Sequence, residues 1–196
     1  MKKGTIIILA IIGLVIVAFM WGSGIYNNMV ELEEGVNSQW SNVENVYQRR
    51  ADLIPNLVNT VKGYAAHEKE TLEAVIKARS EATSVKIDPS NMKPGDMKQF
   101  QAAQDNLSGA LSKLMVVVEK YPDLKANQNF LELQAQLEGT ENRIAVERRK
   151  YNETVEVYNK TIRRFPNNVV NMFLGFEKKE YFEASEGAEK APEVKF

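Results

Sequence analysis

The sequence contains no cysteine and a single histidine, His67, in 196 residues. Without cysteine, neither a disulfide framework nor a lipid anchor attached to cysteine is possible. One histidine cannot supply the paired Glu-x-x-His motifs of a di-iron bundle. A hydrolytic triad is also not credible, because the chain has no cysteine and only this one histidine. His67 could bind a metal together with Glu68 and Glu70, but we interpret it as a solvated helix residue. We therefore expect no metal, no cofactor and no catalytic residue.

Proline and glycine are also scarce, with six and eleven residues, and neither sign of charge dominates. The 25 Lys and Arg residues balance 26 Asp and Glu residues, giving a formal net charge of -1. Such a balance provides no long-range field that would attract nucleic acid, so we expect no nucleic-acid partner. No segment shows the period-two alternation of a strand, which favours an all-α fold.

One long uncharged run is present, over residues 5–24. At 1.5 Å per residue it is long enough to cross a hydrocarbon core of about 30 Å. A cleaved signal peptide is the alternative, but it would have a shorter apolar region and a small-residue cleavage site. Here the large residues Phe19, Met20 and Trp21 lie near the end of the run instead, and Gly22 to Gly24 is a weak cleavage candidate. We predict an uncleaved membrane anchor in contact with the lipid bilayer.

The charges that flank this run predict its orientation. Lys2 and Lys3 precede it, whereas Glu31, Glu33 and Glu34 follow it. Because positive charge stays on the cytoplasmic side, we expect a single-pass protein with a cytoplasmic N-terminus and an extracytoplasmic body.

After the anchor, apolar residues recur at steps of three and four, the pattern of long amphipathic helices. The pattern predicts helices over residues 26–85 (with a kink at Pro55), 96–121, 124–165 and, as a short element, 169–176. We therefore expect one N-terminal transmembrane helix followed by an antiparallel bundle of three long helices and one short helix. The expected organisation is an anchor over 1–25, a bundle over 26–184 and a C-terminal tail over 185–196.

The first of these helices is longer than its expected partners, so its membrane-proximal apolar stripe has no obvious cover. The stripe consists of Met29, Leu32, Val36, Trp40 and Val43. An exposed stripe of this size usually contacts another chain, which predicts self-association and a homo-oligomer. In the alternative interpretation, the fourth helix and the tail fold back over it.

Five charged residues interrupt the apolar stripes at positions that face the core: Arg50, Glu68, Arg79, Glu141 and Arg148. Buried charge is costly unless it is paired, so we expect these side chains to form a structural network that fixes helix register. A catalytic or ligand-binding cluster is the alternative, because perturbed charges also gather at functional sites.

Several segments resemble the LemA family of bacterial membrane proteins. They read RRADLIPNLV (49–58), VKGYA (61–65), EKYPDLKAN (119–127), QLEGTENRI (136–144), RRKYN (148–152) and YFE (181–183). The resemblance covers nearly the whole chain after the anchor. It implies a single N-terminal span in the bacterial plasma membrane, an antiparallel helical bundle and links to envelope stress and membrane proteases, but no assigned activity.

Three functions are consistent with these features. The leading hypothesis is a non-enzymatic membrane-anchored scaffold or adaptor that acts through helix-face contacts and self-association. The second is a regulator or accessory subunit of a membrane protease. The third is a small-ligand sensor or enzyme that uses Arg50, Glu68, Glu141 and Arg148, and it requires a polar concavity where these side chains converge.

Overall fold

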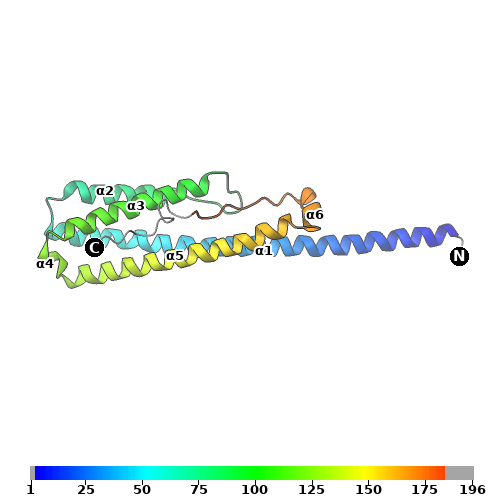
Figure 1. Cartoon of the computed structure of the whole chain (residues 1–196), viewed down its shortest axis with the longest axis horizontal. Coiled ribbons are helices and arrows are strands. Elements are labelled where there is room, and N and C mark those ends of the chain that lie inside the picture. Colours follow the sequence, from blue (N-terminus) through cyan, green and yellow to red (C-terminus); the bar gives the residue numbers. More distant parts are fainter. Residues whose placement is uncertain (1–2, 184–196) are drawn as a thin grey trace, which may run out of the picture.

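A computed structural model of the chain describes residues 3–183. These residues form six helices and no strand, so the predicted all-α fold is confirmed. The predicted tail over 185–196, and Lys2, lie outside the described residues. Figure 1 shows an elongated molecule in which a helical bundle surrounds one end of the first helix, while the other end of that helix projects alone.

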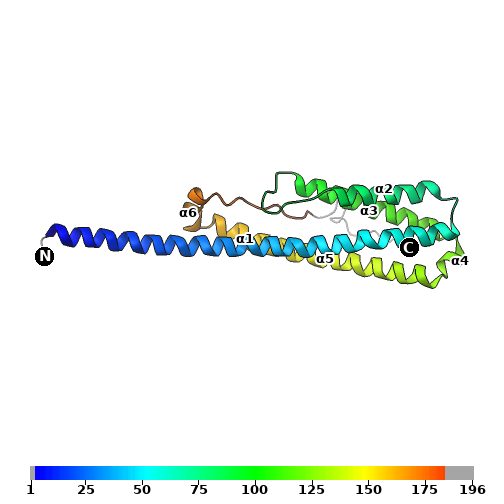
Figure 2. The same cartoon turned by 180° about the vertical axis from the view of Figure 1, so that it is seen from behind.

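The first helix, α1 (Lys3–Tyr64), is continuous over 62 residues, roughly 90 Å at 1.5 Å per residue. An 18-residue window in it has a mean hydropathy of 2.7, and none of that window is buried against protein. By length and composition this part of α1 is apolar enough to cross a membrane, and it is the part that projects in Figures 1 and 2. Burial in the bundle begins at Met29, so the apolar segment and the bundle share one unbroken helix.

The chain reverses at residues 65–68, which corrects the helix predicted over 26–85. Helix α1 remains helical through Pro55, and after the reversal α2 (Lys69–Ser84) runs back beside it (Figure 1). The turn allows the apolar stripe of α2 to join the same core as α1. A straight helix would leave that stripe in water, so burial outweighs a local periodicity that continues across the turn.

Three of the other helices begin and end within a few residues of the predicted positions: α3 (Asp96–Val118), α5 (Gln128–Arg163) and α6 (Asn167–Leu174). The one-turn α4 (Pro122–Lys125) was not predicted as a separate element, and α5 begins after it rather than at residue 124. Helix α5 packs along α1, α2 packs on α3, and α6 lies at the end of the bundle from which the apolar segment projects (Figures 1 and 2).

The core consists of two clusters along α1. The cluster far from the apolar segment is aliphatic and joins α1, α2, α3 and α5 around Leu57 and Leu114. The cluster near the apolar segment is rich in aromatic side chains, which include Trp40, Tyr151 and Tyr158. The two ends of the bundle therefore have different packing chemistry.

The membrane-proximal stripe of α1 belongs to the aromatic cluster, so the expectation that this chain leaves it uncovered is wrong. Met29, Val36, Trp40 and Val43 are buried, and Leu32 packs against them as a partly buried residue. Side chains of α3, α5 and the segment after α6 provide the cover. The alternative interpretation named the fourth helix and the tail, and the tail lies outside the described residues. Self-association through any other surface stays a prediction.

Replacement of Leu114 by alanine tests the aliphatic cluster. Leu114 is fully buried, so Leu114→Ala should lower the free energy of unfolding by about 2–5 kcal/mol through lost burial and a residual cavity. The matched control is Leu131→Ala on the exposed side of α5, which should cost less than about 1 kcal/mol. Urea unfolding of the detergent-solubilised chain, followed by circular dichroism, measures both. Equal losses would contradict the proposed core.

Candidate functional site

The segment after α6 is the most distinctive feature of the bundle. Residues 175–183, which we call the strap, have no regular secondary structure and run along the bundle back toward the start of α3 (Figure 1). The strap begins at Gly175, whose φ of 76° places it in the left-handed region that favours glycine. Backbone N–H and C=O groups packed against protein need hydrogen-bond partners, and the strap has no neighbouring strand to supply them.

Side-chain amides supply these partners in pairs. Asn159 of α5 donates to the Lys179 carbonyl at 2.9 Å and accepts from the Lys179 N–H at 3.0 Å. Asn152, two turns earlier on α5, makes the same two bonds with Phe182, both at 2.9 Å. Each amide presents a donor and an acceptor side by side, as a neighbouring strand does. The surface that holds the strap includes Trp40 of α1, Gln101 of α3, and Asn152 and Asn159 of α5, and we call it the groove. The groove therefore binds the strap through its main chain.

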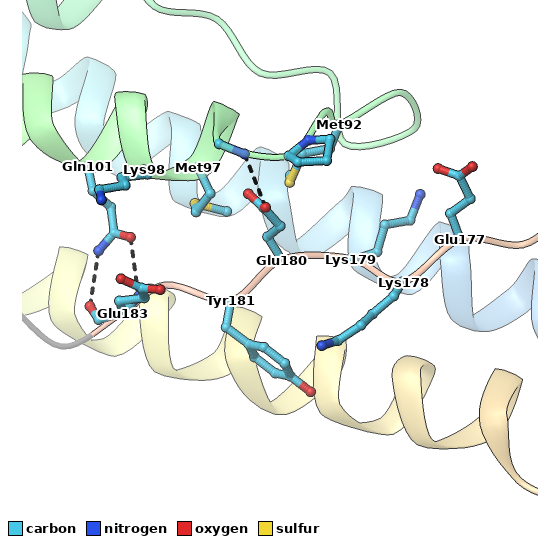
Figure 3. A pocket seen from close by; sticks show the side chains of 12 residues that line it. Met92, Met97, Lys98, Gln101, Glu177, Lys178, Lys179, Glu180, Tyr181 and Glu183 are labelled. Carbon is cyan, nitrogen blue, oxygen red and sulfur yellow. Dashed lines mark hydrogen bonds between the residues drawn. The ribbon is translucent and has the colours of Figure 1, made fainter.

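Two further amides extend this pattern. Gln101 of α3 donates to the Glu183 carbonyl at 3.0 Å and accepts from its N–H at 3.2 Å, as Figure 3 shows. Asn171 of α6 pairs with both backbone groups of Phe176 at 2.9 Å. The four amides come from three helices and hold both ends and the middle of the strap.

Phe182 anchors the strap in an aromatic pocket. Its ring stacks on Trp40 at 5.9 Å between centroids and meets the edge of Tyr151 at 5.4 Å. The Arg148 guanidinium lies 4.8 Å from the ring centroid and donates to the Glu183 carbonyl at 2.9 Å. The pocket therefore selects an aromatic side chain and covers it with a cation.

Lys179 forms the second side-chain anchor, and it is buried. Its Nζ lies 2.7 Å from the carboxylate of Glu33 and donates to the Pro89 carbonyl at 2.9 Å. It also lies 5.8 Å from the ring centroid of Tyr158, whose hydroxyl donates to the Glu177 carbonyl. The groove thus recognises a lysine and, three residues later, a phenylalanine.

The strap does not fill the space around it. A hollow of about 660 Å³ lies between the strap and residues 92–101, which comprise the end of the loop before α3 and the first turns of α3 (Figure 3). Glu180 reaches across one side of it and accepts from the Gly95 N–H at 3.2 Å.

Arg50 marks the boundary between the two core clusters. Only 2% of this residue is exposed, and its guanidinium donates to Gln104 Oε1 at 2.6 Å and to Ser108 Oγ at 2.9 Å, and forms a salt bridge with Glu141. Gln104 in turn donates to the Ala82 carbonyl at 3.1 Å. This polar cluster therefore joins α1, α2, α3 and α5 in one layer.

The remaining predicted network residues make separate contacts. Glu68 accepts from the Tyr121 hydroxyl at 3.0 Å, and Arg79 donates to the Ala51 carbonyl at 2.6 Å. Arg148 contacts the strap, as described above. The structure thus brings Arg50 and Glu141 together and distributes the other three residues over the bundle.

Sequence reasoning missed the strap and the amides that hold it. The segment is short and extended, and its polar residues show no periodicity. The available signal was the pair Asn152 and Asn159, which are seven residues apart and therefore share one face of α5. Buried amides on one face of a helix require partners, and a strand-like segment provides them.

Comparison with known proteins agrees with this architecture. The family model described as LemA family matches residues 39–196. The chain belongs to the LemA family. The matched region of this LemA-family chain includes the strap and its pocket, and the apolar run over 5–24 precedes it.

Named relatives support the assignment. Two magnetosome proteins of Paramagnetospirillum magneticum, MamQ 1 and MamQ 2, are each 30% identical over 175 residues, which cover 81% of this chain and 64% of the relative. Protein LemA of Metamycoplasma hominis is 26% identical over 160 residues, which cover 82% of this chain and 69% of that protein. The chain therefore spans less than two thirds of the length of the magnetosome relatives. None of these names states a catalytic activity.

Loss of the Glu141 charge tests the polar cluster. Glu141→Gln leaves the buried Arg50 guanidinium without its carboxylate, although Gln104 and Ser108 remain. Because the Glu141 side chain is 45% exposed, we expect a moderate loss of about 1–2 kcal/mol in the free energy of unfolding. The control is Glu153→Gln, whose partner Arg149 is exposed and lies 4.0 Å away; it should cost about 0.5 kcal/mol or less. Unchanged urea unfolding of Glu141→Gln would contradict the cluster's role.

The tyrosines of α5 predict a loss of stability at alkaline pH. Burial, with a smaller contribution from the Glu180 charge, raises the pKa of Tyr151; burial and the nearby Glu33 raise the pKa of Tyr158. A phenol whose pKa is raised by folding contributes stability below its unfolded pKa of about 10, and that contribution is lost as pH rises above it.

Tyr151→Phe should therefore reduce the difference in unfolding free energy between about pH 8 and pH 11. Among the described residues the Tyr151 hydroxyl has no hydrogen-bond partner, so this variant should retain its stability at neutral pH. Tyr158→Phe, which loses the bond to the Glu177 carbonyl, should be less stable than Tyr151→Phe at neutral pH. The reverse order would contradict the hydroxyl geometry.

Proposed function

We propose that this LemA-family protein is a non-enzymatic adaptor, anchored in the bacterial plasma membrane by the apolar part of α1, with its N-terminus in the cytoplasm and its bundle outside. We further propose that copies associate when the strap of one copy occupies the groove of another. The observation that carries this proposal is the groove itself, which binds an extended segment through main-chain bonds and two side-chain anchors.

The strap of a second copy is the occupant whose chemistry fits. It presents Lys179 for the Glu33 carboxylate and Phe182 for the Trp40 pocket. In the closed form, each strap lies in the groove of its own copy. Exchange of the strap between copies keeps every contact of the closed form, so the exchanged and closed forms differ little in free energy apart from the entropy of association. Gly175, at the start of the strap, is the position at which the chain can redirect.

Anchoring favours this exchange because it confines the copies to one surface, where their effective concentration is high. The proposal replaces the stripe over Met29 to Val43 as the route to self-association, since that stripe lies in the core. A regulator or accessory subunit of a membrane protease stays the alternative prediction. The ligand-sensor hypothesis required four charged residues to converge: Arg50, Glu68, Glu141 and Arg148. Only Arg50 and Glu141 are in contact, whereas Glu68 and Arg148 bond elsewhere.

Cross-linking tests strap exchange directly, because the chain contains no cysteine of its own. Gln101 and Glu183 lie side by side across the groove (Figure 3). Two differently tagged full-length variants, Gln101→Cys and Glu183→Cys, are mixed in liposomes and treated with a short bismaleimide. We expect a cross-linked dimer that carries both tags. The hydrogen bonds from Asn152 and Asn159 to the strap remain in both variants, so the strap of one copy can still bind in the groove of the other.

Two controls define the result. Val116→Cys replaces Gln101→Cys in the first; it is exposed on α3 outside the groove and should give no mixed dimer. The double variant Gln101→Cys/Glu183→Cys reports the closed form as an intrachain product. If that product forms in the double variant and mixed dimers do not form in the mixture, strap exchange is wrong.

A further inference from the structure

Helix α6 has an unusual distribution of polar and apolar side chains. Asn167 is buried and donates to the Thr161 carbonyl at 3.1 Å, and Asn171 is bound to the backbone of Phe176. By contrast, Met172 is 82% exposed and Phe173 is 86% exposed. The helix therefore turns two of its three asparagines toward the protein and its large apolar residues away from it, unlike a helix whose apolar face packs on the protein.

The residues before α6 continue this apolar surface. Phe165, which follows the end of α5, is 80% exposed, and Val169 and Leu174 are exposed as well. With Met172 and Phe173 they form a cluster that we call the α6 patch. No other part of the bundle within residues 25–183 exposes large apolar side chains to this degree in one short segment. Contiguous apolar surface of this kind marks a contact with a partner or a membrane.

The position of α6 along α1 indicates which of these it contacts. Phe176, two residues after α6, lies with its ring 6.0 Å from that of Tyr26 on α1. Tyr26 is two residues beyond the apolar run that ends at Gly24, which is about 3 Å along the helix axis. The headgroup layer on each side of a bilayer is about 5–7 Å thick. With the apolar run in the hydrocarbon, α6 is held at the level of the headgroups.

We propose that α6 is a second membrane contact, which lies in the interface of the leaflet from which the bundle emerges. The α6 patch enters the boundary between headgroups and acyl chains, while the bond from Asn167 to Thr161 of α5 and the contact of Phe176 with Tyr26 of α1 keep the helix attached to the bundle. Aromatic and methionine side chains suit this boundary, and a short amphipathic helix binds there by burying its apolar face. The inference rests on the proposed anchoring by α1 and is independent of strap exchange.

Charge next to the patch fits the same surface. Arg163 and Arg164 end α5 immediately before Phe165, and Lys178 follows α6; they border an open hollow with Lys160. Lys160 forms a salt bridge with Glu156, whereas the salt bridges found within residues 3–183 do not include Arg163, Arg164 or Lys178. These three cations are placed to contact anionic lipid headgroups, which adds an electrostatic attraction to the apolar contact.

Site-specific fluorescence tests the proposal, again helped by the cysteine-free sequence. Three full-length variants carry one NBD label each: Met172→Cys in the α6 patch, Ile16→Cys in the apolar run and Val116→Cys, an exposed apolar residue on α3. Each is reconstituted in phosphatidylcholine vesicles with and without phosphatidylglycerol. Lipids that carry a spin label near the headgroup, or near the bilayer centre, act as quenchers.

The label at Met172 should show blue-shifted emission and lose fluorescence mainly to the shallow quencher, whereas the label at Ile16 should lose it mainly to the deep quencher. The label at Val116 should be unaffected by either. Substitution of Arg163 and Arg164 by glutamine should reduce the shallow quenching at Met172 in the anionic vesicles only.

Each remaining outcome overturns a defined part of this account. If Ile16 is quenched and Met172 is not, anchoring stands and the α6 contact is wrong. If neither is quenched, the anchor fails and the α6 contact fails with it. Equal quenching at Met172 and Val116 would show nonspecific adhesion of the bundle to lipid and would also overturn the inference.

Discussion

The pairing of α1 with α5 is the contact on which the rest of the molecule depends. Helix α1 carries one apolar seam from Met29 to Val61, and no short element can cover it. Helix α5 packs along that seam, and the strap covers the aromatic part that α5 leaves open. The hairpin of α2 and α3 covers the other end. Every other element is therefore placed by the need to keep one long helix face out of water.

A single buried cation divides this seam. Arg50 interrupts the apolar contacts of α1 and receives its partners from α3 and α5. Desolvation makes such a group a weak source of stability, and its Nε has no hydrogen-bond partner among the described residues, but its terminal nitrogens are paired with α3 and α5 in this alignment of the helices. A shift of α5 by one turn would move Glu141 away and leave the guanidinium without a carboxylate, although Gln104 and Ser108 of α3 would remain. We interpret the cluster as a device that selects one register among several that would bury similar apolar area.

The sequence was sufficient for the helices and insufficient for what lies between them. Steps of three and four predicted α3 and α5 because each buries one face, whereas α6 was predicted only as a short apolar segment. The apolar stripes indicated that Arg50 and Glu141 both face the core; Arg50 is buried there, but the Glu141 side chain is 45% exposed. The turn at residues 65–68 was missed because the apolar steps continue through it, and only tertiary burial requires the reversal. The strap was missed for a different reason. An extended segment held by side-chain amides follows no period, and its partners Gln101 and Asn159 are far apart in sequence.

Helix α1 has no break between the apolar run and the far end of the bundle, and this continuity has a mechanical consequence. A continuous helix couples angle as well as position, so a rotation of the apolar run about the helix axis also rotates the part of α1 that contributes to the groove. The phase relation is fixed at about 100° and 1.5 Å for each residue between them. The number of residues between Gly24 and Trp40 therefore sets the direction in which the groove faces, relative to the apolar run.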